Sequence, residues 1–424
     1  MAIETVTRTF SGSLMLIRQH ARPSPYAGKV AERIERESVV AFRLASHHLD
    51  VRLGEQDLLT AAGTCGIQNT PPGSALLAFQ ARVEGVSADV VAEAVEDRSM
   101  LLTWSMRGAP YYVPTSEADV YTTGVLPTTE EARRHFVLGV EQAVDRLGLS
   151  LTKVVEMVKA ATREVLSGRQ LAIDELGAEV AARIAPELTA QQRGIWNEEG
   201  PYALGQPIGE AVVHFCVRLL ALQRIVCFAP RTGNRAPFVL TEEWLGRPVA
   251  EADPAACRLE LLRRYLRCYG PSTRRDFATW LGVRTGDVDP WWSQLEDELV
   301  EVDFGGRAWA LARDLDALRT ATMPIGVRLL PPRDAYTQLR DREAIVDKAH
   351  HRAVWRTSGD PGTMLADGEI VGTWRARKGG RKLRVELKAF EPLSRGHQEA
   401  LAAEAESIAP LREASSVSVD VTTY

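Results

Sequence analysis

The fold is decided by CRLELLRRYLRCYGPSTRRDFATWLGVRTGDVDPWWSQLEDELVEVDFGGRAWAL, residues 257–311. Apolar residues at helical spacing predict a first helix that ends at Gly270-Pro271. Ser272-Thr273 opens a second, short helix, and a third is expected over 285–297. Two segments in which apolar and polar residues alternate flank Gly305-Gly306, and this pattern predicts a β-hairpin. This is the order of a winged helix, a helix-turn-helix variant that normally lays one helix in the DNA major groove, although such a module can also serve protein contacts alone.

The same order of helices and ribbon is expected twice more, upstream of that stretch. In the first unit, helices are predicted over 38–49, 56–63 and 88–97, and the strands LLTWSMR and YYVP follow. Thr70-Pro71-Pro72 predicts the start of a further helix there, with Thr70 as N-cap and Pro71 at the first helical position. In the second unit, the strands RIVCFA and PFVLT follow helices that are expected over 128–147, 150–167, 173–184 and 207–222.

Beyond residue 325 the sequence changes to a β pattern. Asp367-Gly368 and Gly379-Gly380 predict two hairpin turns, and a terminal helix is expected over 395–411. We expect a small β-barrel or sheet here. The second hairpin is strongly basic, with cationic side chains at Arg375, Arg377, Lys378, Arg381, Lys382 and Arg384. At a hairpin tip they can reach DNA phosphates, although lysine on an edge strand also serves to prevent aggregation.

The composition is that of a globular protein of two to four domains. The 424 residues are 45% hydrophobic and 25% charged, which is ordinary for this class. Neither a signal peptide nor a membrane-length apolar run is recognisable, so a cytoplasmic, nucleoid-associated location is expected. The net charge of −5 favours a localised contact with DNA over a basic protein that coats it. The five cysteines include no C-x-x-C pair, so reduced core thiols are expected, with no metal and no cofactor.

Four stretches, in order, resemble the AlkZ-like winged-helix DNA glycosylases. They are GIQNTPPGSALLAFQARV, LLTWSMRGAPYYVP, RRYLRCYGPSTRRDFATWLG and HRAVWRTSGDPGTMLADGEIVGTWR. The resemblance covers roughly residues 38–411 and implies an α+β chain of tandem winged helices followed by a C-terminal β-domain. The expected parts are an N-terminal extension (1–37), winged helices 1 (38–124), 2 (125–246) and 3 (247–324), and a β-barrel-like domain with the basic hairpin (325–424).

The family motif is a glutamine, any residue, and then glutamine or aspartate, just before a helix. Gln68 matches its first position and Asn69 its middle, whereas Thr70 replaces the second amide or carboxylate. The resemblance implies that Gln68 orients a water molecule, with Asn69 and Thr70 as further catalytic candidates. Without the resemblance these three residues would be interpreted as a polar capping loop. Arg107, just before Gly108, either contacts a phosphate beside this site or merely ends a strand.

Two hypotheses follow. The first is a monofunctional DNA glycosylase that excises bulky alkylated purines from double-stranded DNA. The second is a non-catalytic DNA-binding protein, either a regulator or a lesion binder. Two departures from the family pattern motivate it: Thr70, and Tyr111, which stands where many relatives carry histidine. In both cases we expect a monomer with no membrane partner, because no exposed dimerisation helix is recognisable.

Overall fold

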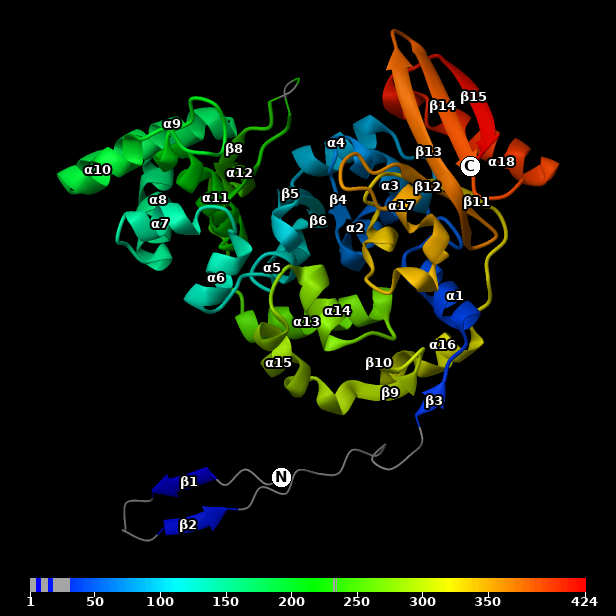
Figure 1. Ribbon diagram of the computed structural model, residues 1–424, viewed down its shortest axis with the longest axis horizontal. Coiled ribbons are helices and arrows are strands. Elements are labelled where there is room, and N and C mark those ends of the chain that lie inside the picture. The colour runs from blue at the N-terminus through cyan, green and yellow to red at the C-terminus, as the bar shows by residue number, and fades with distance from the viewer. Residues whose placement is uncertain (1–4, 9–13, 18–30, 232, 234) are drawn as a thin grey trace.

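The computed structural model describes residues 5–8, 14–17, 31–231, 233 and 235–424 (Figure 1). It is a mixed structure of helices and sheets, and no sheet in these described ranges closes on itself. Near the N-terminus, β1 (Thr5–Arg8) pairs antiparallel with β2 (Leu14–Ile17). None of the described helices has the length and apolar character required to cross a bilayer.

The stretch at 257–311 forms the predicted elements. They are α13 (Pro254–Tyr269), α14 (Arg274–Leu281), α15 (Thr285–Gln294), β9 (Leu299–Asp303) and β10 (Arg307–Leu311). The Thr273 hydroxyl accepts the backbone N–H of Asp276 at 3.1 Å, which caps α14. Gly282, with φ of +91°, ends the helix, as the sequence predicted.

Elements from before residue 47 pack on this unit. The short β3 (Glu32–Arg33) pairs in parallel with β9. The next helix, α1 (Arg36–Ser46), lies against α13 and α16 (Leu315–Thr320). Part of the N-terminal segment, whose role the sequence left open, is therefore a strand of the third unit's sheet.

The ribbons of the first two units join in one sheet. Its order is β4 (Ile67–Gln68), β6 (Pro110–Pro114), β5 (Met100–Trp104), β7 (Val226–Phe228) and β8 (Phe238–Leu240). Leu102 of the first ribbon pairs with Phe228 of the second. The helices of the first unit are α2 (Leu58–Cys65), α3 (Ser74–Arg82), α4 (Ala88–Glu96) and α5 (Ala118–Tyr121). Gln68 thus lies on the edge strand of a sheet that two units share.

The second unit is a helical group on the side of the molecule away from the C-terminal sheet (Figure 1). It comprises α6 (Glu130–Phe136), α7 (Glu141–Arg146), α8 (Leu151–Leu166), α9 (Ile173–Ile184), α10 (Ala190–Asn197), α11 (Ile208–Leu222) and α12 (Thr241–Leu245). The prediction of a single helix over 128–147 is wrong, because the structure has two helices there, α6 and α7. The chain breaks near Gly139, where φ is +122°, a value that a helix does not contain. Helix α10 was not predicted.

The C-terminal region is an open sheet. Its order is β11 (Val327–Leu330), β12 (Gly362–Ala366), β13 (Glu369–Gly379), β14 (Lys382–Ala389) and β15 (Ser416–Thr423). Both predicted hairpins are present. The prediction of a barrel-like domain is wrong, because β11 and β15 are the two edges of the sheet and do not pair. Helix α18 (Arg395–Ser407) packs against both edge strands instead and covers one face of the sheet.

Candidate active site

The candidate site begins at Gln68, on the edge strand β4. Gln68 is opposite Tyr111 of β6 in the sheet, and its side chain is only 6% exposed. Its Oε1 accepts a hydrogen bond from the Tyr111 hydroxyl at 2.9 Å. Just before the strand, Gly66 has φ of +73°, and a Cβ there would lie 3.0 Å from the Tyr111 ring. A side chain at position 66 would crowd the Tyr111 ring, and glycine also accepts the positive φ there.

Arg107 lies at the centre of the polar contacts. Its Nη2 donates to the Tyr111 hydroxyl at 2.7 Å and, at 3.4 Å, to the side-chain oxygens of Gln68 and Gln338. Its Nη1 donates to the carbonyl of Trp280, at the end of α14. A Cβ at Gly282 would lie 3.1 Å from Arg107, so the helix-ending glycine also permits this close approach. One guanidinium thus joins the first unit, the third unit and the segment before β12.

A cavity of about 250 Å³ opens beside Gln68. The cationic side chains that line it are Arg107, Arg333, Arg340, Arg342 and Arg356, with Asp360 as the carboxylate. Burial lowers the pKa of Arg340, and the charges of Arg107 and Arg342 lower it further. The Nε of Arg340 is buried and has no partner among the described residues. Crowded arginines with unused donors are complementary to a phosphate group.

A buried ion pair holds the wall of this cavity. The Asp334 carboxylate accepts two hydrogen bonds from Arg82, at 2.7 and 2.8 Å, and neither side chain is more than 2% exposed. Asp334 also accepts the backbone N–H of Tyr336 and begins the short η7 helix (Ala335–Gln338), which carries Gln338 to the cavity. Burial lowers the pKa of Arg82, but Asp334 more than offsets this, so the pKa lies above its usual value.

Asn69 and Thr70 do not line the cavity with Gln68. The Asn69 side chain accepts the backbone N–H groups of Gly73 at 2.8 Å and Ala75 at 3.4 Å, so it caps α3. The prediction that Thr70 is the N-cap is therefore wrong. The helix begins at Ser74, four residues after Thr70, and the cap comes from the preceding amide. Successive side chains of an extended segment point to opposite sides, which explains why Gln68 and Asn69 separate.

The basic hairpin lies at the tip of β13 and β14. Three of its cations have partners: Arg375 donates to the carbonyl of Gly359 at 2.5 Å, Lys378 pairs with Glu413 and Arg384 pairs with Asp420. The side chains of the other three are exposed and form no hydrogen bond or ion pair with any described residue: Arg377, Arg381 and Lys382. The contact to Gly359 places the start of the hairpin beside the segment that contains Arg356 and Asp360.

Several residues around the cavity were not singled out from the sequence. They are Gln338, Arg340, Arg342, Trp355, Arg356 and Asp360. The last three lie in the stretch HRAVWRTSGDPG, which was used only for the family resemblance. The guanidinium of Arg342 lies over the Trp355 ring, 4.5 Å from its centroid. The adjacent Trp355 and Arg356 of this loop were the feature of the sequence that could have indicated a site.

Comparisons with known proteins agree on one family. The family model described as DNA glycosylase AlkZ-like matches residues 61–411. A protein from Streptomyces sahachiroi, named an interstrand DNA cross-link repair glycosylase, is 27% identical over 348 residues, which cover 79% of this chain and 86% of the relative. The solved structure of the Streptomyces sahachiroi DNA glycosylase AlkZ has a TM-score of 0.67 at 24% identity, and it covers 92% of this chain and 100% of that one.

Proposed function

The chain belongs to the AlkZ-like DNA glycosylase family, and on that basis we propose that it removes purines with bulky alkyl groups from double-stranded DNA by hydrolysing the N-glycosidic bond. The observation that carries the proposal is the Gln68 amide, held by Tyr111 at the edge of an arginine-lined cavity. The Streptomyces relative is named for cross-link repair, so purines joined across the two strands belong among the substrates to test.

We infer that the three helix-plus-ribbon units are winged helices and act together as a monomer. The proposed boundaries are those expected from the sequence, except that α1 packs on the third unit; the catalytic residue lies in the unit at 38–124. Because units one and two share a sheet through Leu102 and Phe228, they would contact the duplex as one body. The nucleoid is the corresponding location of the enzyme.

Hydrolysis of this N-glycosidic bond needs little acid catalysis from the protein. A purine alkylated on its ring nitrogen is cationic and leaves with the electron pair of the C1′–N9 bond, which neutralises it. Water then bonds to C1′ of the cationic sugar, and its spare proton passes to solvent. The task of the enzyme is to hold that water and to stabilise the developing sugar cation. The Gln68 oxygen has two lone pairs, so it can accept from Tyr111 and from water together.

Arg107 needs a different partner once DNA is bound. A guanidinium that donates to Gln68 opposes a cationic transition state, because like charges repel. A DNA phosphate would attract Arg107, and Arg340 and Arg342 would lie alongside on the same phosphate backbone. That movement would free the second lone pair of Gln68 for water. The exposed hairpin cations Arg377, Arg381 and Lys382 would contact phosphates further along the duplex.

The test is release of free base from a duplex with one defined alkylated guanine. We expect Gln68→Ala to lower the single-turnover rate by about 100-fold, because the water loses its orienting group. Affinity for the same duplex should stay within about twofold, because the phosphate contacts remain. Gln80→Ala, at a half-buried glutamine of α3 outside the cavity, is the matched control and should keep the wild-type rate.

Two outcomes would contradict this proposal. Equal loss of binding and excision in Gln68→Ala would make the residue structural. Salt-sensitive binding without base release from any alkylated duplex would identify a non-catalytic DNA-binding protein, as the replacement of the second motif position by Thr70 first suggested.

A further inference from the structure

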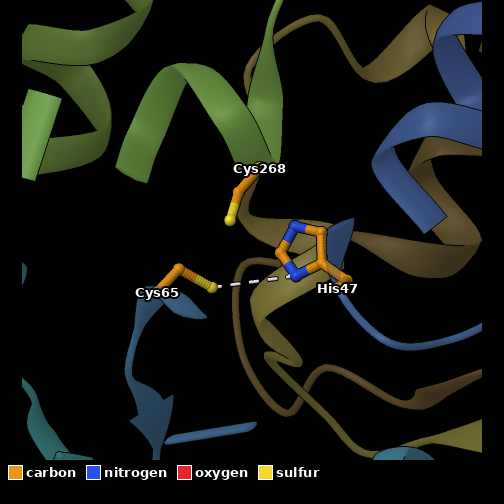
Figure 2. Close-up of side chains that lie close together, drawn as sticks. All are labelled: His47, Cys65 and Cys268. Atoms are coloured by element: carbon orange, nitrogen blue, oxygen red, sulfur yellow. Dashed lines mark hydrogen bonds between the residues drawn. The ribbon is translucent and has the colours of Figure 1, made fainter. Parts of the chain in front are cut away.

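The side chains of two cysteines and one histidine lie close together near β4, the strand that carries Gln68. His47 follows α1, Cys65 ends α2 and Cys268 lies on α13, and their side chains point toward one another (Figure 2). One ligand atom from each of the three lies within 4.8 Å of the other two. All three residues are at most 3% exposed. The cluster is thus a sealed set of donors from two helices and from the residue that follows a third.

Ordinary hydrogen bonding leaves this cluster incomplete. The His47 Nδ1 lies 3.7 Å from Cys65 Sγ, and the Cys268 thiol donates to the carbonyl of Thr64 at 3.7 Å. The other imidazole nitrogen, Nε2, is buried and has no partner among the described residues. The two sulfur contacts, at 3.7 Å each, are weak hydrogen bonds, so the two sulfurs and Nδ1 are left able to bind a ligand.

We propose that His47, Cys65 and Cys268 bind a thiophilic metal ion, with zinc as the ion to test first. Zinc bonds to sulfur at about 2.3 Å and to nitrogen at about 2.0 Å, which separates tetrahedral ligand atoms by roughly 3.5–3.8 Å. The 3.7 Å between Cys65 Sγ and His47 Nδ1 already has this spacing. The Tyr269 hydroxyl also lies 3.9 Å from Cys65 Sγ, but it donates to the carbonyl of Ala335 at 2.8 Å, so the protein offers three ligands.

The charges of the cluster favour a divalent cation. Two thiolates and a neutral imidazole around a divalent ion bury no net charge, whereas an uncompensated buried thiolate is costly.

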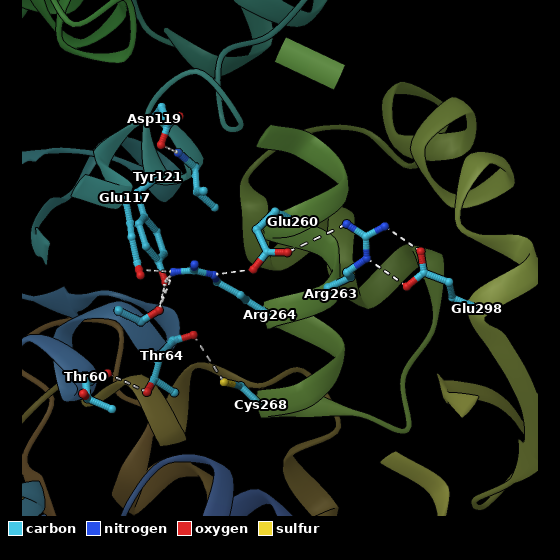
Figure 3. Close-up of polar contacts among 12 residues, drawn as sticks. Thr60, Thr64, Glu117, Asp119, Tyr121, Glu260, Arg263, Arg264, Cys268 and Glu298 are labelled. Atoms are coloured by element: carbon cyan, nitrogen blue, oxygen red, sulfur yellow. Dashed lines mark hydrogen bonds and ion pairs between the residues drawn. The ribbon is translucent and has the colours of Figure 1, made fainter. Parts of the chain in front are cut away.

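The surrounding contacts fix the helices that carry the ligands. Arg264 of α13 donates to the carbonyl of Gly63 at 2.7 Å and pairs with Glu117 at 2.5 Å, which clamps α13 to α2 (Figure 3). Cys65 and Cys268 are therefore positioned independently of their own contact. Because burial excludes an oxidant from both sulfurs, metal uptake during folding fits this site better than a redox switch, whose cysteines must be accessible.

The experiment uses the full-length protein purified under reducing conditions. After dialysis against a weak chelator, elemental analysis should find one zinc per chain. Cobalt exchanged into the wild-type protein should give the sulfur-to-metal absorption of a thiolate site and the intense visible bands of tetrahedral geometry. Cys268→Ala should weaken the metal affinity by at least about tenfold. Cys216→Ala removes an equally buried helical thiol of α11 and should leave zinc content unchanged.

The cobalt spectrum of the wild type keeps the test decisive even if Cys268→Ala fails to fold. A wild-type chain with reduced thiols that takes up neither zinc nor cobalt would overturn the proposal. So would full metal content in a folded Cys268→Ala variant, or a disulfide between Cys65 and Cys268 in the purified protein. The inference does not depend on glycosylase activity, since none of these measurements involves DNA.

Discussion

Two polar clusters among the described residues lie on either side of Gly66 and Ile67. At Gln68 the side chains are mostly cationic and line a cavity of about 250 Å³. At Cys65, three residues earlier, the donors are two thiols and an imidazole, and they are sealed from solvent. Arginines with unused donors indicate a site that receives an anionic ligand from outside. A closed set of thiols and imidazole indicates a site that is filled during folding and that holds the strand in place.

The largest effect is expected at the buried ion pair of Arg82 and Asp334, which lies beside both clusters. Asp334→Ala leaves the buried Arg82 charge without its partner, so we expect the free energy of unfolding to fall by about 3–5 kcal/mol. Urea unfolding measures this. Glu164→Ala, which breaks the exposed pair with Arg183, should leave stability nearly unchanged. A fall below about 1 kcal/mol for Asp334→Ala would show that the wall of the cavity does not depend on this pair.

A smaller change separates positioning from stability at the cavity. Tyr111→Phe removes one hydrogen bond to Gln68, worth about 1 kcal/mol, so kcat for base excision should fall about fivefold with KM unchanged. Tyr112→Phe is the matched control, because Tyr112 points to the other face and packs against Phe79. An effect of Tyr111→Phe on KM alone, or on zinc content, would contradict its position between Gln68 and Arg107.

The smallest expected effect is electrostatic and concerns the basic hairpin, for which we proposed contacts with DNA phosphates. Arg377→Ala removes an exposed hairpin cation, so the slope of log affinity against log salt should become shallower by about 1. Lys153→Ala, at an exposed lysine of α8, should leave the slope unchanged. Metal content should match the wild type in both variants. An unchanged slope in Arg377→Ala would show that the hairpin does not contact DNA and is a solvated edge ribbon.

Local chemistry made much of the fold predictable. The Thr273 cap, the Gly282 stop and the glycine turns at 305–306 and 379–380 act within a few residues, and each element formed where it was expected. The errors arose where distant packing decided the outcome. The helix over 128–147 breaks near Gly139, and the C-terminal sheet stays open because α18 covers its face. The Thr70 cap failed because the helix begins only at Ser74, and Asn69 accepts the N–H groups of Gly73 and Ala75 at its start.

The sequence by itself determined the helix and ribbon order, the family and the position of Gln68, because these depend on short-range patterns. Tertiary structure alone decided what surrounds that glutamine. Arg340 and Arg342 come to the cavity from more than 270 residues away, and His47, Cys65 and Cys268 share no spacing that predicts a site. Such groups meet only when separate helices pack, since packing, and not chain distance, sets which side chains are neighbours.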